Sequence, residues 1–299
     1  MRVLVTGSSS HLARALLPLL CNHASIQQVT GIDIQPAVYQ HPKFTAIQDD
    51  LTRVDLSKLL HQHDGLIHLA FIVLRGKTPI TAMRAINISA TQRLFDTAVA
   101  LGIAHIVHLS SASVYGDGVM LQEDAPLRPI AGFLYAQHKT ELEHWLIANH
   151  PHICRLRPHI ILGQHAQTLL VNILRQPFYV KLPDPQPQLQ VVHENDVARA
   201  ILTALLNQAQ GAYNLASNPC FSFRDAIKQR HRYAIAVSPR LAKSALNLIW
   251  RTTGIGGEIG WIDGVHNTLT LNCSKAQRVL GWQAENATQD ILLGNVMAC

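Results

Sequence analysis

The strongest constraint on the fold is a regular alternation of two hydrophobic patterns along the first half of the chain. Short runs of apolar and β-branched residues predict strands, and the longer segments between them carry apolar residues at helical spacing. Parallel strands joined by right-handed crossover helices place helices on both faces of one sheet. The alternation therefore predicts an α/β fold of the Rossmann type, with a doubly wound parallel sheet. The predicted strands are 2–6, 28–33, 44–48, 65–69, 105–110 and 153–157.

A turn with one glycine joins the first predicted strand to the first predicted helix, in the sequence TGSSSHLA. Gly7 holds the first glycine position of a dinucleotide-binding fingerprint, Ser10 holds the second, and Ala13 holds the third, where alanine still permits close packing. Backbone N–H groups and the dipole of a helix that begins here attract a pyrophosphate. We therefore expect this turn, including His11 and Leu12, to bind a dinucleotide. Ser10 either weakens that binding or hydrogen-bonds the phosphates.

Asp33 ends the second predicted strand, twenty residues after Ala13. A carboxylate at this place accepts hydrogen bonds from the adenosine ribose of NAD and repels the 2′-phosphate of NADP. The sequence therefore predicts NAD as the cofactor, with NADP disfavoured. The competing interpretation of Asp33 is a turn-forming residue. Asp50 and Leu51 follow the third predicted strand, where they could hold the edge of the adenine.

A serine cluster and a YxxxK motif supply the residues expected to carry the chemistry. Ser111 lies in HLSSASVYG at the end of the fifth predicted strand, and YAQHK holds Tyr135 and Lys139. Residues four apart on a helix project from one face, so the lysine ammonium can favour the tyrosine phenolate. The tyrosine can then exchange a proton with a hydroxyl or carbonyl while a nicotinamide takes the hydride. Combined with the glycine turn and Asp33, the motif predicts a catalytic Ser111, Tyr135 and Lys139.

Beyond Gly163 the alternation loosens, and the Pro- and Gln-rich segment KLPDPQPQLQ predicts an irregular loop. A strand near 190–192, a helix from 196 to about 206 and a strand over 212–215 then predict a return to the sheet. We therefore expect an NAD-binding Rossmann domain and a smaller C-terminal substrate-binding domain, or cap. The first comprises residues 1–163 and about 190–216, and the cap comprises about 164–189 and 217–299.

In their order along the chain, these motifs resemble those of an extended short-chain dehydrogenase/reductase of the NAD-dependent epimerase/dehydratase family. The resemblance covers nearly the whole length of the chain. The matching segments are TGSSSHLA (6–13), GID (31–33), DDLT (49–52), LIHLA (66–70), NISAT (87–91), SSASVYG (110–116), YAQHK (135–139), RPHIILG (157–163), VVHENDVARAI (191–201), GAYNLA (211–216) and SKAQRVLGW (274–282).

The resemblance assigns roles to individual residues. It implies that Tyr135 is the acid/base, that Lys139 contacts the nicotinamide ribose, and that Ser111 is the catalytic hydroxyl. It further implies that Asn87 lies near the active site and that Ala70 and Pro158 line the cofactor, the proline beside the nicotinamide. The competing interpretation of Asn87 is a polar residue on a helix surface.

The activity implied by the resemblance is oxidation of a hydroxyl-bearing carbon by NAD. Release of the ketone makes a dehydrogenase, and its reduction from the other face makes an epimerase; the same residues serve both. Nucleotide sugars are the commonest substrates of the family and are the substrates we expect. A steroid- or flavonoid-like alcohol is the apolar alternative. Ser10 also keeps open a different class, a non-catalytic dinucleotide-sensing or dinucleotide-binding protein, although Tyr135 and Lys139 favour an enzyme.

Two departures bear on the substrate. Ile160 stands where many members that act on nucleotide sugars carry an asparagine, and GWIDGVHNTLTLN (260–272) stands in place of their diphosphate contact. Basic residues elsewhere could meet phosphates instead. These are Arg75, Lys77, Arg232, Arg240 and Arg251.

Composition bounds the partners and the location. The formal charge of +6 favours anionic partners, but the densest basic region, from Arg224 to Arg251, predicts first a solvated face, then an anionic-substrate cradle, and nucleic acid last. No apolar run approaches the roughly 18 residues of a membrane span. Five scattered cysteines without a CxxC pair favour reduced thiols, so we expect a cytoplasmic enzyme. HQH at 61–63 lacks further ligands, so we expect no metal and solvent-exposed histidines.

The family resemblance further implies a homodimer formed through the helices that carry Asn87 and Tyr135. Both helical segments hold apolar residues on more than one face. Because oligomers of identical chains are mostly closed and symmetric, a two-fold dimer is the expected form.

We predict that the protein, stripped of bound nucleotide, binds NAD more tightly than NADP, because the Asp33 carboxylate repels the 2′-phosphate. Parallel calorimetric titrations with the two nucleotides measure the difference. Equal affinities would remove Asp33 from the ribose site. Binding of neither nucleotide would make the non-catalytic interpretation the leading one.

Overall fold

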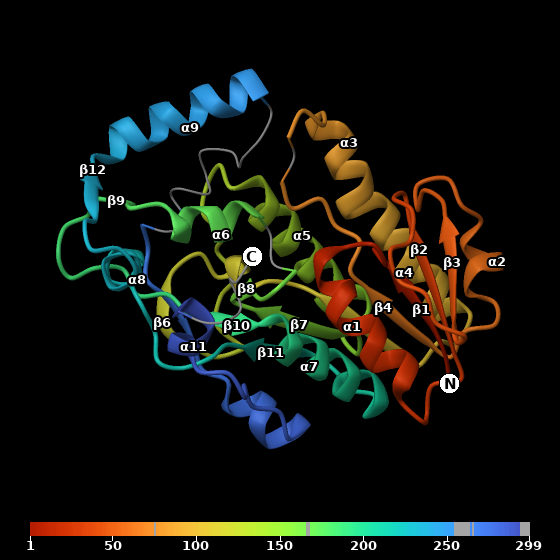
Figure 1. Cartoon of the computed structure of the whole chain (residues 1–299). Coiled ribbons are helices and arrows are strands. Elements are labelled where there is room, and N and C mark those ends of the chain that lie inside the picture. The colour runs from red at the N-terminus through yellow and green to blue at the C-terminus, as the bar shows by residue number, and fades with distance from the viewer. Residues whose placement is uncertain (75, 166–167, 254–263, 265, 294–299) are drawn as a thin grey trace.

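A parallel sheet forms the centre of the protein. The computed structural model describes residues 1–74, 76–165, 168–253, 264 and 266–293 (Figure 1). Val3, Leu4 and Val5, in a strand with a neighbour on each side, are fully buried, as expected when helices cover both faces. The predicted α/β Rossmann fold is therefore confirmed. The seven strands, in spatial order, are β11 (Ala212–Leu215), β7 (Cys154–Pro158), β5 (His105–Leu109), β4 (Gly65–His68), β1 (Arg2–Thr6), β2 (Gln28–Asp33) and β3 (Phe44–Gln48).

Helices cover the two faces of the sheet in separate layers. On one face α1 (His11–Asn22) and α7 (Glu194–Leu206) lie side by side, as Figure 1 shows. Leu12, Leu16 and Leu20 recur at helical spacing along α1 and are buried in the core cluster shared with α7. On the other face α2 (Leu56–Leu60), α4 (Thr91–Ala100) and α5 (Leu134–Asn149) bury a second cluster.

The strand order reverses direction at β1. The chain passes from β1 to β2 and β3 on one side, and then crosses back to β4 and β5 on the other. In an open parallel sheet the loops that leave two such neighbouring strands diverge, and the crevice between them is where ligands bind. This topology therefore places the binding site at the carboxyl ends of β1 and β4.

Two sequence-based expectations differ from the structure. The strand predicted near 190–192 exists as β10 (Val191–His193), but it pairs with β8 (Ile160–Leu162) in a separate two-stranded sheet and does not join the main sheet. A hydrophobic pattern predicts a strand without naming its partner, which explains the error. The helical spacing of apolar residues over 79–101 predicts one continuous α-helix. The structure instead has α3 (Ile80–Arg84), the wider π-helical turn η1 (Ala85–Ala90) and then α4.

The remaining elements lie outside the main sheet, and the division into two domains stays a prediction. The elements outside the main sheet that have not yet been given are η2 (Ala112–Val114), β6 (Gly118–Leu121), α6 (Thr168–Arg175), β9 (Phe178–Val180), α8 (Phe223–Arg230), β12 (Ile235–Val237), α9 (Pro239–Thr253), β13 (Leu269–Leu271), η3 (Ala276–Leu280) and α11 (Thr288–Leu293).

Among the described residues, no helix combines the length and the apolar character that crossing a bilayer requires.

A buried ion pair joins α5 to β7. Nε and Nη2 of Arg157 donate to the two carboxylate oxygens of Glu143 at 2.8 and 2.7 Å, and the Ser110 hydroxyl donates to the same carboxylate at 2.6 Å. Nη1 of Arg157 donates to the Tyr115 hydroxyl, which in turn donates to Oδ1 of Asn214 on β11. Because these groups satisfy one another in the interior, α5 is held in one position against the sheet.

We predict that Glu143→Ala lowers the free energy of unfolding by about 3–5 kcal/mol, because it leaves the Arg157 guanidinium as an uncompensated buried charge. Urea unfolding measures the change. Glu141→Ala on the same helix is the matched control, since Glu141 forms a solvent-exposed pair with Arg84 and is expected to contribute about 1 kcal/mol or less. Equal effects of the two substitutions would contradict the prediction.

Candidate active site

The turn after β1 has the backbone geometry that a dinucleotide-binding fingerprint requires. Gly7 has a φ of +72°, and a Cβ at this position would lie 2.6 Å from the backbone nitrogen of Ala70, so only glycine fits. Ser10 has an ordinary extended backbone and is the N-cap of α1, where its Oγ accepts a hydrogen bond from the Ala13 N–H at 3.4 Å. Ser10 therefore begins the helix without strain, although it replaces a glycine.

Asp33 lies beside this turn, at the carboxyl end of β2. Its Oδ2 accepts the Ser9 N–H at 3.0 Å, and its Oδ1 accepts the Gln35 N–H at 2.9 Å. The carboxylate is thus fixed next to the glycine turn and remains half-buried. This is the placement that a ribose contact requires.

Asp50 and Leu51 follow β3 and do not line the cavity described below. Oδ1 of Asp50 accepts the Thr52 N–H at 2.8 Å, which shapes the loop. Leu51 is buried, and its carbonyl oxygen accepts a hydrogen bond from Arg93 at 3.1 Å. Their contact with an adenine stays a prediction.

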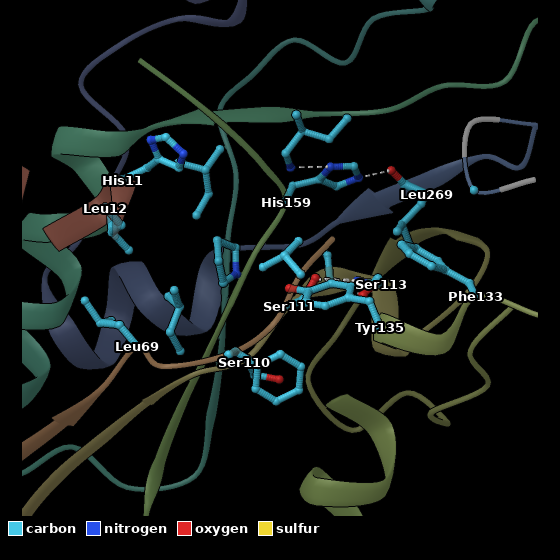
Figure 2. Close-up of a pocket in the computed structure, with 18 of the residues that line it drawn as sticks. His11, Leu12, Leu69, Ser110, Ser111, Ser113, Phe133, Tyr135, His159 and Leu269 are labelled. Carbon is cyan, nitrogen blue, oxygen red and sulfur yellow. Dashed lines mark hydrogen bonds between the residues drawn. The ribbon is translucent and has the colours of Figure 1, made fainter. Parts of the chain in front are cut away.

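A cavity of about 290 Å³ runs from the N-terminus of α1 to the YxxxK motif. Its size is close to the lower end of small-molecule pockets. Figure 2 shows Ser111 and Ser113 beside Tyr135 in this cavity. The described lining residues are Ser10, His11, Leu12, Leu69, Phe71, Val73, Leu109, Ser110, Ser111, Ala112, Ser113, Gly116, Ile130, Phe133, Tyr135, Pro158, His159, Ile160, Ile161, His165, Leu189, Glu194, Gly264 and Leu269.

Ser111 and Tyr135 meet from different elements. Ser111 follows β5 as the N-cap of η2, and Tyr135 lies in the first turn of α5. The Tyr135 side chain hydrogen-bonds with Ser111, whose Oγ also accepts from the N–H and the hydroxyl of Ser113 at 3.1 and 2.9 Å. Burial raises the pKa of Tyr135 to about 12, and the hydrogen bond with Ser111 opposes this shift. The tyrosine therefore needs a positive charge nearby to act as a base near neutral pH.

Lys139 lies one turn beyond Tyr135 and is buried. Its Nζ donates to the Leu109 carbonyl oxygen at 2.6 Å and lies 3.6 Å from the centre of the Phe71 ring. Burial lowers its pKa to about 7, against the attraction of Glu143 one turn further along the helix. The expected pairing on one helix face is thus present, with Nζ 5.9 Å from the centre of the Tyr135 ring.

Asn87 is buried in η1 and does not line the cavity. Its Oδ1 accepts the Ile72 N–H at 2.8 Å, and its Nδ2 donates to the Ile72 carbonyl at 3.1 Å and lies 3.3 Å from Nδ1 of His138. It ties the segment after β4 to α5 and is not a helix-surface residue. Pro158 lines the cavity at the end of β7, whereas Ala70 packs against the glycine turn.

Most of the apolar wall around Ser111 and Tyr135 carried no signal in the sequence. His159 adds no charge to it: burial lowers its pKa to about 4, its Nδ1 accepts the Ile160 N–H, and its Nε2 lies 2.8 Å from the Leu269 carbonyl oxygen. Only Ile160 carried a signal, as a departure from the family pattern. The wall is formed by Val73, Ile130, Phe133, Ile160, Leu189 and Leu269.

Glu194 also lines the cavity; it lies in the matching segment VVHENDVARAI, but the sequence assigned it no role. Its carboxylate accepts the His165 N–H at 3.1 Å and lies 2.9 Å from Nδ1 of the same residue. A Cβ at Gly163 would lie 2.2 Å from the Glu194 carboxyl carbon, so glycine leaves room for it. In the described lining, no lysine or arginine accompanies this acidic group.

The basic residues expected to meet phosphates do not line this cavity where the structure describes them. Lys77, Arg232 and Arg240 are exposed and absent from the lining. Arg75 and the Arg251 side chain lie outside the described residues, as does the first part of 260–272.

The histidine pair at 61–63 corrects another expectation. His61 is exposed, but His63 is half-buried and its Nε2 lies 2.9 Å from the Thr30 hydroxyl. Full exposure was therefore wrong for His63, because it packs against β2, and burial lowers its pKa. Among the described residues, no group of three histidines, cysteines or acidic residues is arranged to hold a metal.

A doubly wound sheet, a glycine turn at its switch point and a YxxxK helix together define a dinucleotide-binding protein of the extended short-chain dehydrogenase/reductase class. Residues 3–216 match the NAD dependent epimerase/dehydratase family, and the chain belongs to this family. It is accordingly an enzyme, and its cofactor is NAD.

Individual relatives are distant. A Mycobacterium tuberculosis protein of uncharacterised function is 23% identical over 256 residues, covering 79% of this chain and 67% of the relative. A 3 beta-hydroxysteroid dehydrogenase/Delta 5→4-isomerase of Vaccinia virus (strain Copenhagen) is 29% identical over 182 residues, covering 54% of this chain and 52% of the viral protein. The solved structure of UDP-glucuronic acid 4-epimerase from Bacillus cereus with NAD has a TM-score of 0.75 at 21% identity, covering 98% and 96% of the two chains.

The buried lysine predicts a specific pH dependence of stability. Between the folded pKa of about 7 and the ordinary value of 10.5, the unfolded chain holds a proton on Lys139 that the folded protein lacks. The free energy of unfolding should therefore rise with pH across this window. We predict that, from pH 7 to pH 9, wild type gains about 2 kcal/mol relative to Lys139→Met in urea unfolding. Lys58→Met, which removes an exposed lysine, should show no such pH-dependent difference; a constant difference for Lys139→Met would contradict the prediction.

Proposed function

We propose that this enzyme transfers a hydride between NAD and the hydroxyl-bearing carbon of an uncharged, largely apolar alcohol, such as a steroid-like alcohol. The observation that carries the proposal is the wall around Ser111 and Tyr135, which is apolar and, in the described lining, contains no lysine or arginine. A nucleotide sugar would bring a diphosphate, whose buried charges require cationic partners. An apolar ring needs none and gains by leaving water.

The residues of the chain handle the proton and the orientation. When bound, NAD accepts the hydride from the substrate carbon or returns it. In the oxidative direction the Ser111 hydroxyl donates to the substrate oxygen, and the Tyr135 phenolate takes the hydroxyl proton as the carbon loses its hydride. The C–O bond becomes the carbonyl of a ketone. Protonated Lys139 lowers the cost of the phenolate, which burial alone makes high.

The opposite end of the site suits a dinucleotide. The Gly7 turn lets the backbone approach closely, the N-terminus of α1 carries the positive end of the helix dipole, and the Asp33 carboxylate lies beside the turn. We propose that these groups bind the pyrophosphate and the adenosine ribose. Ser10 supports this arrangement, because its hydroxyl caps the helix.

Nucleotide sugars are the second candidate substrate class. They are favoured by the likeness in fold, over nearly the full chain, to a Bacillus cereus enzyme named UDP-glucuronic acid 4-epimerase. The viral relative named a hydroxysteroid dehydrogenase supports the apolar alcohol, although the match spans about half of each chain. A homodimer, a cytoplasmic location and a contribution of Asn87 to the site stay predictions.

We predict that Tyr135→Phe lowers turnover by about two to four orders of magnitude, because it removes the proton acceptor, and leaves the affinity for NAD unchanged. NADH formation and calorimetry measure the two quantities. Tyr233→Phe is the matched control, since Tyr233 is exposed and does not line the cavity. Unchanged turnover in Tyr135→Phe would exclude this mechanism.

A substrate panel separates the two candidate classes. Hydroxysteroids and other polycyclic secondary alcohols are compared with UDP- and dTDP-sugars, with NAD supplied in each case, and both NADH release and epimer formation are followed. We expect turnover of the apolar alcohols. Turnover of the nucleotide sugars alone would overturn the substrate class while leaving the role of Tyr135 intact.

A further inference from the structure

Helix α9 presents an apolar stripe to solvent. Leu241 and Leu248 are each 62% exposed, and Ala245 and Ile249 are also exposed. Their spacing of four, seven and eight residues places all four on one helix face. The adjoining side of the helix, which includes Ala242 and Leu246, is half-buried. An amphipathic helix of a globular protein normally turns its apolar face to the core, whereas this part of the apolar face of α9 is exposed.

The position of α9 extends the same surface. Figure 1 shows the helix along the outer edge of the molecule, away from the main sheet. Large apolar side chains are also exposed on neighbouring elements: Phe178 in β9, its pairing partner Ile235 in β12, and Tyr233. Strand β12 directly precedes α9, and exposed apolar side chains grouped on neighbouring elements indicate an interaction site. We call Phe178, Tyr233, Ile235 and the α9 stripe the α9 surface.

The chain segment that contains α9 and the residues leading into it has charges of a single sign. Residues 226–253 contain six basic residues and no acidic residue, whereas the whole chain has 25 basic and 19 acidic residues. The rest of the chain is therefore neutral, and this segment alone accounts for the net charge of +6. Arg232 and Arg240, next to the exposed apolar residues, are themselves exposed. The six basic residues are Lys228, Arg230, Arg232, Arg240, Lys243 and Arg251.

We propose that the α9 surface docks on an anionic lipid bilayer, with the apolar stripe inserted among the acyl chains and the basic residues at the head groups. An exposed apolar helix face with basic flanks is the pattern of interfacial helices, in which each part contributes to binding. A second copy of the chain would cover the stripe equally well, but it would bring two segments of charge +6 together. An anionic surface has the complementary charge.

The inference does not rest on the proposed function. None of the residues of the α9 surface lines the catalytic cavity, so the binding of vesicles and the turnover of substrates can be lost separately. Docking through α9 would place the enzyme at the boundary between water and lipid without a membrane span.

The test is flotation of the full chain with two kinds of vesicle, phosphatidylcholine alone and an equal mixture with phosphatidylglycerol. We expect binding to the mixed vesicles, weak binding to the neutral ones, and a decline as salt is raised. The paired substitution Leu241→Gln and Leu248→Gln should lower binding at least about tenfold, as should Arg232→Glu with Arg240→Glu. Val119→Gln with Ile147→Gln, which changes two exposed apolar residues elsewhere, is the matched control and should bind as wild type does.

Circular dichroism and NAD affinity confirm that each variant is folded. Absence of wild-type binding to mixed vesicles at low salt overturns the proposal. Loss of binding in the charge variant but not in the stripe variant would show a general polyanion surface, which also overturns it. So would a wild-type dimer in light scattering that becomes monomeric in the stripe variant, because a second copy would then cover α9.

Discussion

The arrangement of the site depends on the buried ion pair between Glu143 and Arg157. Glu143 lies one turn after Lys139, which lies one turn after Tyr135, so whatever holds the carboxylate orients the whole reactive face of α5. Arg157 anchors that carboxylate to β7, and the Ser110 hydroxyl anchors it to the end of β5, directly before Ser111. The two sides of the catalytic pair are therefore positioned through one carboxylate. A surface contact would not do this, because an exposed side chain keeps its rotamer freedom.

The pKa values of the reactive groups on α5 follow from their burial. Removing Tyr135 and Lys139 from water raises the pKa of the phenol to about 12 and lowers the pKa of the ammonium to about 7. Each shift disfavours the charged form of its group, and a protonated Lys139 near Tyr135 offsets part of the cost of forming the phenolate. The nearby Glu143 opposes the loss of charge on Lys139. The Glu143 carboxylate thus both anchors α5 and favours the charged form of Lys139.

The apolar cavity wall and the α9 surface consist of different residues, and both favour a water-insoluble substrate. The wall lacks the cations that a diphosphate would require in the part of the lining that the structure describes, while the exposed Arg232 and Arg240 are sequence neighbours of the exposed Tyr233 and Leu241. Arg232 and Arg240, which the sequence offered as phosphate contacts, are thus absent from the described cavity lining. An enzyme for water-insoluble alcohols that rests on a lipid surface would meet its substrate where the substrate dissolves.

The sequence by itself determined the local elements and the motifs carried on them. The bounds of β1, β2, β3 and β11 were predicted to the residue, because a short apolar run bounded by turn residues is long enough for a strand and too short for a helix. The Tyr135–Lys139 spacing likewise needed only the helical repeat. Tertiary structure alone decided that β10 pairs outside the main sheet, that Asn87 bonds to the Ile72 backbone and is absent from the described cavity lining, and that Leu189 and Leu269 belong to that lining. These outcomes depend on contacts between segments far apart in the chain, and a one-dimensional pattern records which residues prefer burial but not which neighbours bury them.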